Sequence, residues 1–242
     1  MSLPYRTLAT VAVASLALAG CQPAKDAFGK QVRAYLLEHP EVLQEASVKL
    51  QEKQLAEAHK AASGALNTHR AALERDPRDF VANPAGKITV VEFFDYRCGY
   101  CKVAAPEVLD LIAKNPDVRF VFKEFPIFGG ESNLAAQVAL SGPARAKTLD
   151  LYRAFMGEKA LDEAAIDRHL RAVGVDPAAA KTAGASPQVQ KQLADTHQLA
   201  AALNIEGTPA FIVGDRMISG ADIPALQQAI AETRAGNLKT AG

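Results

Sequence analysis

The sequence predicts an α/β fold in which a mixed sheet carries helices on both faces, a block of helices is inserted between the strands, and a helical segment precedes the whole. Residues 87–95 and 118–125 are rich in β-branched and aromatic side chains, as buried strands are. Residues 131–204 show only helical patterns. Residues 209–219 hold two short apolar runs around a Gly-Asp turn, which predicts a hairpin.

Composition and charge narrow the class of protein. The chain has 242 residues and 49% hydrophobic content, which suffices for the core of one main domain. Lys plus Arg and Asp plus Glu number 27 each, so the formal net charge is zero, and the basic residues form no long block. Nucleic-acid binders carry a concentrated basic patch, so we expect no nucleic-acid partner.

Residues 1–20 have the pattern of an export signal, in which Arg6 is followed by an apolar run too short to span a bilayer. The Leu-Ala-Gly-Cys sequence that ends at Cys21 resembles the lipobox of bacterial lipoproteins. It implies cleavage before Cys21, lipidation of that thiol, and a membrane anchor in the bacterial periplasm. The alternative is ordinary cleavage after residues 17–19, which leaves Cys21 near a free N-terminus. Residues 21–27 are expected to form a tether.

Residues 28–76 predict a short helix and then a long one that begins after Pro40. The long helix carries two series of residues seven apart, typical of a weak coiled-coil stripe: Leu55, Ala62 and His69, and His59, Leu66 and Leu73. This stripe predicts a homo-oligomer that forms through residues 28–76. The alternative is a solvated helix that lies on its own catalytic domain.

The main domain is expected at residues 80–238, after a linker marked by Asp-Pro and Asn-Pro pairs. Its elements are expected in the order strand, helix, strand, helical insertion, hairpin and closing helix. Their ranges are 87–95, 99–114 with a break or bend near Pro106, 118–125, about 131–204, 209–219 and 222–234.

A Cys-x-x-Cys pair, Cys98 and Cys101, lies where the first strand passes into the first helix of this domain. A zinc ribbon would need a second pair or nearby histidines, and a structural disulfide across so short a loop would gain little. The N-terminus of a helix offers free N–H groups and partial positive charge, which stabilise a thiolate at Cys98. Cys101, one turn further into the helix, suits the shielded thiol that resolves a mixed disulfide.

Glu92 supports a redox interpretation independently of the cysteines. By two-residue alternation it shares a strand face with Ile88, Val90 and Phe94, so its carboxylate is expected among apolar side chains. Burial would raise its pKa, and it lies six residues before Cys98, so it could accept the proton of Cys101. The alternative is a bulge that exposes Glu92 to solvent without consequence.

The Cys-x-x-Cys pair at a helix start, Pro106, and Gly-Thr-Pro at residues 207–209 together resemble the thioredoxin superfamily. The helical insertion makes the chain similar to the DsbA family of bacterial thiol-disulfide oxidoreductases. The Gly-Tyr dipeptide between the cysteines and the segment at residues 29–46 are similar to the suppressor-of-copper-sensitivity C proteins. The resemblance implies a thioredoxin fold with Pro209 as a cis-proline that faces the cysteines, and with Thr208 binding the substrate backbone.

The expected function is that of an exported thiol-disulfide oxidoreductase, an oxidase or isomerase with a redox-active disulfide between Cys98 and Cys101. Its expected partners are cysteine-containing envelope proteins and a membrane redox partner that resets the pair, and no metal or other cofactor is expected. Tyr100 replaces the His that could stabilise the thiolate, so a less extreme oxidant than the strongest DsbA enzymes is predicted. Arg97 either supplies positive charge there or is solvated. Two alternatives are a copper-binding or copper-buffering thiol module and a non-catalytic structural lipoprotein.

Overall fold

The computed structural model describes residues 22–236. The predicted signal peptide and Cys21 lie outside these residues. By its internal contacts the chain divides into two compact units, Met1–Ala58 and His59–Gly242. None of the helices within residues 22–236 combines the length and the apolar character needed to cross a membrane.

The described part of the first unit is helical. Helix α1 covers Gln22–Glu38, so residues 22–27 belong to a helix and are not the tether that the sequence predicted. Helix α2, Glu41–Thr68, begins directly after Pro40, which disfavours a helical conformation in the residue before it and so separates the two helices. In this unit large apolar side chains are exposed on both helices: Phe28, Val32, Tyr35, Leu37, Leu43, Val48 and Leu50.

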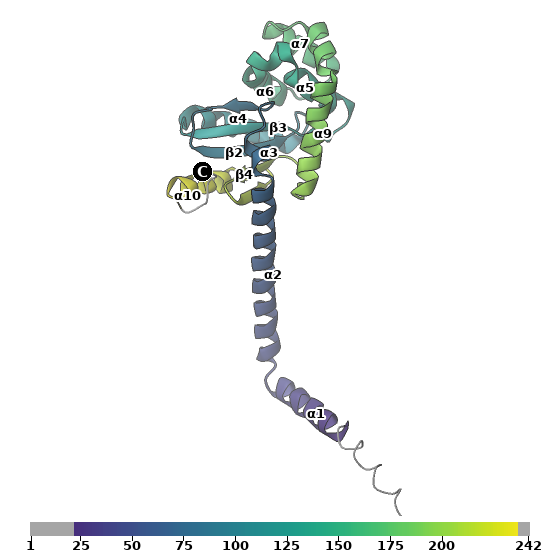
Figure 1. The fold of residues 1–242 in the computed structure, drawn as a ribbon, viewed down its shortest axis with the longest axis vertical. Coiled ribbons are helices and arrows are strands. Elements are labelled where there is room, and N and C mark those ends of the chain that lie inside the picture. The colour runs from purple at the N-terminus through teal and green to yellow at the C-terminus, as the bar shows by residue number, and fades with distance from the viewer. Residues whose placement is uncertain (1–21, 237–242) are drawn as a thin grey trace, which may run out of the picture. The chain divides into compact units, whose positions relative to one another are not determined.

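The second unit contains a five-stranded mixed sheet with the strand order β1-β3-β2-β4-β5 (Figure 1). The central strand β2, Ile88–Phe94, runs parallel to β3, Val118–Glu124, and antiparallel to β4, Ala210–Val213. Strand β5, Arg216–Ser219, completes the predicted hairpin with β4. Strand β1, Phe80–Ala82, pairs antiparallel with β3 and was not predicted, because three residues are too few to show an alternating pattern.

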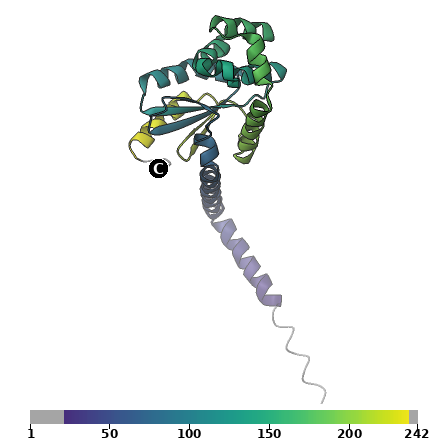
Figure 2. The ribbon, with the colours of Figure 1, turned by 45° about the horizontal axis from the view of Figure 1, so that its top comes forward.

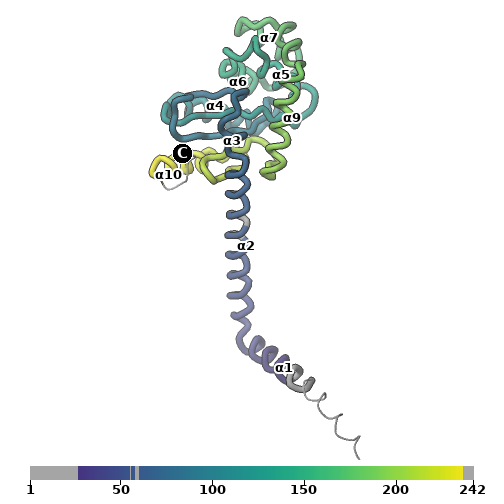
Figure 3. Tube along the Cα trace, in the orientation of Figure 1, coloured from purple at the N-terminus to yellow at the C-terminus, as the bar shows by residue number. Residues whose placement is uncertain are grey.

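The helices of this unit follow the predicted order. Helix α4 covers Gly99–Lys114, the predicted range, and continues through Pro106 without a break. The insertion between β3 and β4 contains helices joined by short loops and no strand, as Figure 3 traces. It consists of α5 (Gly130–Leu140), the 3-10 helix η1 (Gly142–Lys147), α6 (Thr148–Gly157), α7 (Glu163–Ala172), α8 (Pro177–Gly184) and α9 (Pro187–Ala202). Helix α10, Ile223–Arg234, closes the unit.

Helices cover both faces of the sheet, as the turned view in Figure 2 makes visible. On one face Val90 and Phe94 of β2 pack in a core with buried residues of α4, α6 and α10. On the other face Val91 and Phe93 pack with the C-terminal part of α9. The alternation of side chains along β2 therefore divides its residues between two cores, and it places Glu92 on the α4 face.

The second core also contains Leu66 of α2 and Leu73 of α3, Arg70–Glu74. Both side chains are buried within their own domain, so these two members of the predicted coiled-coil series cannot form a seam between chains. The buried ammonium of Lys123 in β3 strengthens this attachment, because it donates to the carbonyl of Ala72 (2.6 Å) and pairs with Asp79. The second unit thus begins near residue 59, earlier than the predicted boundary at residue 80.

Candidate active site

The two cysteines lie at the junction between β2 and α4. Cys98 is the N-cap residue of α4, and its Sγ accepts a hydrogen bond from the backbone N–H of Cys101 at 3.4 Å. Such a cap uses one of the N–H groups that an α-helix leaves free at its start. Both cysteines are free thiols, so the site is in its reduced form. The local geometry is that which the sequence predicted for a reactive thiol.

The two thiols differ strongly in acidity. The hydrogen bond from the Cys101 thiol is the largest cause that lowers the pKa of Cys98, from 9.0 to about 6, and the backbone amide of Cys101 acts in the same direction. Cys101 is fully buried, and burial raises its pKa far above the ordinary range. At neutral pH, Cys98 is therefore mostly a thiolate, whereas Cys101 holds its proton.

Glu92 lies inside the α4 face of the sheet with no solvent exposure. Burial raises the pKa of Glu92 from 4.5 to about 8, partly offset by the Tyr152 hydroxyl, which donates to the two carboxylate oxygens at 3.1 and 3.2 Å. The charge of Glu92 also contributes to the raised pKa of Cys101, which shows that the two groups interact. The carboxylate can therefore exchange a proton with its surroundings near neutral pH.

The loop before β4 completes the site. The Thr208–Pro209 peptide bond is cis, as the resemblance implied. The Cys98 thiol donates to the carbonyl oxygen of Thr208 at 3.1 Å, although the two residues are 110 positions apart in the chain. The structure thus brings together the predicted residues Cys98, Cys101, Glu92 and the Thr208–Pro209 pair, while Cys21 lies outside the described residues.

Two further groups near the cysteines were not predicted. Tyr152 comes from α6, and no pattern in the sequence links a helix of the insertion to a strand 60 residues earlier. Glu124 at the end of β3 is buried and accepts a hydrogen bond from the Tyr96 hydroxyl at 2.7 Å. Burial holds the pKa of Glu124 well above its ordinary value. The sequence did offer a signal for this residue, because Asp95 and Glu124 are acidic side chains at the ends of two strands that the structure places side by side.

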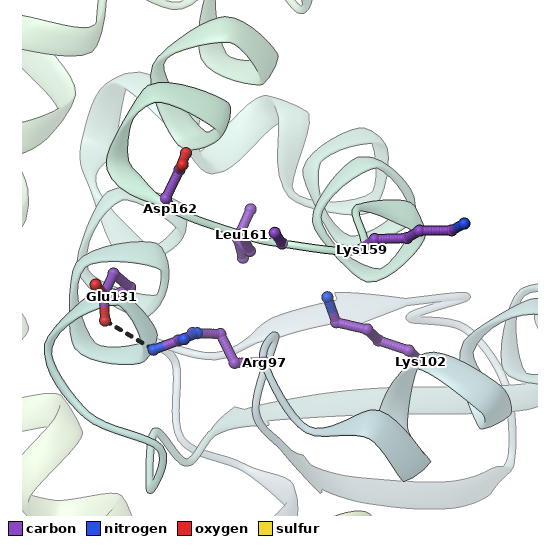
Figure 4. Close-up of a pocket in the computed structure, with 7 residues that line it drawn as sticks. Arg97, Lys102, Glu131, Lys159, Leu161 and Asp162 are labelled. Atoms are coloured by element: carbon purple, nitrogen blue, oxygen red, sulfur yellow. Dashed lines mark hydrogen bonds and ion pairs between the residues drawn. The ribbon is translucent and has the colours of Figure 1, made fainter.

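Arg97 precedes Cys98 and Tyr100 lies between the two cysteines, and the charge of neither residue is among the causes of the lowered Cys98 pKa. The Arg97 guanidinium forms an ion pair with Glu131 at 2.7 Å and donates to the carbonyl of Phe128, as Figure 4 shows for the ion pair. It lines a pocket of about 240 Å³ together with Lys102 and residues 159–162. The Tyr100 side chain is 71% exposed. The acidity of Cys98 therefore arises from hydrogen bonds at the helix start.

Among the residues whose side chains the structure describes, no three His, Cys, Asp or Glu side chains converge as the ligands of a metal ion would. A copper ion held at this site would have the two thiols as its ligands, which is an incomplete set.

The comparisons with known proteins agree with this geometry. A family model described as a DSBA-like thioredoxin domain matches residues 89–231, and one described as the copper resistance protein ScsC N-terminal domain matches residues 25–57. The thiol:disulfide interchange protein DsbA of Bordetella pertussis is 33% identical over 140 residues, which are 55% of this chain and 66% of that protein. The match thus spans slightly less than two thirds of this curated relative.

Solved structures cover more of the chain. Proteus mirabilis ScsC in a transitional conformation has 28% identity and a TM-score of 0.64, over 88% of this chain and 98% of that one. BcfH of Salmonella enterica Typhimurium has 34% identity and a TM-score of 0.67, over 87% of this chain and 96% of that one. The DSBA model covers more than half of the chain, and the ScsC model covers the helices in front of it. The chain therefore belongs to the DSBA-like thioredoxin-domain family of oxidoreductases, within its ScsC subgroup.

Proposed function

We propose that this protein is an exported thiol-disulfide oxidoreductase that forms or isomerises disulfide bonds in envelope proteins. The observation that carries the proposal is the convergence on the Cys98 sulfur of the Cys101 amide and the Thr208 carbonyl, at a helix start. The Cys101 thiol and amide make Cys98 the acidic thiol of the pair, and burial keeps Cys101 protonated.

In the reducing direction, the Cys98 thiolate attacks a substrate disulfide. One substrate sulfur becomes bonded to Cys98, and the other leaves as a thiolate that takes a proton from solvent. Cys101 then passes its proton to Glu92 and attacks the Cys98 sulfur, which releases the second substrate thiolate. The protein now holds the Cys98–Cys101 disulfide and the substrate holds two thiols. Oxidation of a substrate dithiol is the same sequence in reverse.

The loop before β4, which faces Cys98, suits a polypeptide substrate. In the free protein the carbonyl oxygen of Thr208 faces the Cys98 sulfur, and this partly exposed loop offers main-chain groups that an extended substrate strand can use. We propose that Thr208 and Pro209 bind the substrate backbone in this way. A membrane redox partner would reset Cys98 and Cys101 after each cycle, and lipidated Cys21 would hold the protein at a periplasmic membrane.

We further propose that the N-terminal helices join copies of the chain into an oligomer with several active sites, which favours an isomerase. Exposed Phe28, Val32 and Tyr35 are spaced by four and three residues, so they share one face of α1. Exposed apolar side chains on one helix face are typical of an interface. Leu66 and Leu73 are buried elsewhere, so the contact is assigned to residues 28–58.

The test is turnover with catalytic amounts of the full-length protein. Refolding of a scrambled disulfide protein is measured with the enzyme far below the substrate in concentration, with Cys98→Ser as control, and the mass in solution is measured in parallel. Many turnovers for the wild type and none for Cys98→Ser are expected. Stoichiometric uptake of copper(I) without turnover would instead support the metal-buffering alternative, and a monomeric mass would contradict the oligomer.

A further inference from the structure

Asp95, the residue after β2, is 1% exposed and is not part of the mechanism above. Each of its carboxylate oxygens accepts two hydrogen bonds. Oδ1 accepts from the Arg97 amide at 2.7 Å and from the Ser132 hydroxyl at 2.8 Å. Oδ2 accepts from the amides of Ile127 and Phe128, at 2.6 and 3.1 Å. These donors replace the water that a buried carboxylate loses.

The donors come from two parts of the chain. Arg97 belongs to the turn that carries Cys98, whereas the other three donors belong to residues 127–132, which follow β3 and begin α5. The carbonyl of Asp95 also accepts from the amide of Cys98 at 3.1 Å. One residue thus connects the amide of the nucleophile to a segment that is about 30 positions away in sequence.

A second set of bonds holds the same two parts together at the surface. The Arg97 guanidinium reaches the carbonyl of Phe128 at 3.2 Å and the carboxylate of Glu131 at 2.7 Å, and Figure 4 shows its side chain directed toward Glu131. The side chains of Ile127 and Phe128 are 37% and 49% exposed. Residues 127–132 therefore present two apolar side chains and an ion pair beside the turn of Cys98.

We propose that Asp95 is a positioning residue for exchange with polypeptide substrates. Its carboxylate fixes residues 127–132 against the active-site turn, so that Ile127, Phe128 and the Arg97–Glu131 pair form a preformed wall. A substrate polypeptide contacts this wall while its cysteine is bonded to Cys98. A small disulfide reaches Cys98 without touching the wall. The inference rests on the proposed function, and it assigns to Asp95 the binding of the protein substrate and not the acidity of the thiol.

The test compares wild type, Asp95→Asn and Ser132→Ala with two disulfides, insulin as the protein and 5,5′-dithiobis(2-nitrobenzoate) as the small molecule. Asparagine keeps the shape but turns one acceptor into a donor that faces other donors. Ser132→Ala removes a single bond and leaves the turn intact. The matched control is Asp176→Asn, which alters the cap of α8, where a carboxylate accepts from the Ala179 amide at 2.9 Å.

We expect Asp95→Asn to raise KM for insulin about tenfold and Ser132→Ala about threefold, since misplaced binding groups reduce productive encounters. The rate with the small disulfide and the thiolate titration of Cys98 should stay within about twofold of wild type for both variants and the control. An unchanged KM in folded Asp95→Asn overturns the proposal. So does a parallel loss on both disulfides with a displaced titration, because Asp95 would then act on the thiol.

If Asp95→Asn does not fold, Ser132→Ala decides, and an unchanged KM for that variant overturns the proposal. Wild-type protein that turns over neither disulfide would instead contradict the proposed function, so the two failures can be told apart.

Discussion

Replacement of Glu92 with Gln isolates the proton-accepting group of the proposed mechanism. Glutamine has nearly the same shape, and its carbonyl oxygen can still accept the hydrogen bond from the Tyr152 hydroxyl. The glutamine side chain at position 92 cannot ionise. Any property of the protein that depends on proton exchange at residue 92 should therefore disappear, while the packing of the α4 face stays the same.

The size of the effect follows from the raised pKa of Glu92, which burial moves from 4.5 to about 8. The folded protein holds this proton more tightly than the unfolded chain, so wild-type stability falls as the pH rises from about 4.5 to about 8. At about 1.4 kcal/mol per pKa unit, the loss over this window is about 5 kcal/mol. Glu92→Gln has no such loss, so its stability relative to wild type should rise by an amount of this order.

Urea unfolding of the reduced proteins across this pH window measures the difference, and pH effects of Cys98 cancel between variant and wild type. Glu107→Gln on the exposed side of α4 is the matched control, because it makes the same chemical change outside the buried face of the sheet. In single-turnover experiments, release of substrate from the Cys98 mixed disulfide should be at least about tenfold slower in Glu92→Gln. A stability difference that is flat with pH would refute the burial argument, and an unchanged release rate would refute the role in proton transfer.

Two further predictions concern the thiol and the domain boundary. The absorbance of the Cys98 thiolate should titrate near pH 6, and Cys101→Ala should raise this midpoint because the Cys101 hydrogen bond is the largest cause of the low pKa. This pKa lies between the values of about 3.5 for DsbA and about 7 for thioredoxin, so the protein should be a weaker oxidant than DsbA. A reduction potential at or above that of DsbA, about −120 mV, would contradict this prediction. Leu73→Ala should lower the free energy of unfolding by about 2–5 kcal/mol, whereas exposed Val103→Ala should change it by less than about 1 kcal/mol. Equal effects in urea unfolding would contradict the early boundary.

The parts of the site that the sequence predicted are those encoded within one element. Alternation along β2 placed Glu92 on a buried face, and the strand-to-helix transition placed Cys98 at a helix start. Each inference needs only the period of a strand or the position of a cap. For the same reason the range of α4 and the hairpin were predicted almost to the residue.

The parts that were missed depend on contacts between distant elements. Tyr152 donates to Glu92 across 60 positions, and Asp95 holds residues 127–132 through backbone amides that leave no trace in the sequence. Leu66 and Leu73 show seven-residue spacing whether they pack on a second chain or on their own domain. A periodic apolar pattern predicts which face of a helix is buried, but it does not identify the surface on which that face packs.

The different acidities of the three active-site groups also bear on the direction of catalysis. At pH 7 Cys98, with a pKa of about 6, is mostly thiolate and can attack at once. In the proposed mechanism the resolving step needs ionised Glu92, and with a pKa of about 8 only about a tenth of the carboxyl is ionised at that pH. The mixed disulfide should therefore form faster than Cys101 resolves it. A substrate held in this state has time for its own thiols to attack the mixed disulfide, and that is the step by which an isomerase rearranges disulfides. In the proposed mechanism this slow proton acceptor would favour isomerisation over simple reduction at neutral pH, and a resolving rate that does not change between pH 7 and pH 9 would contradict that preference.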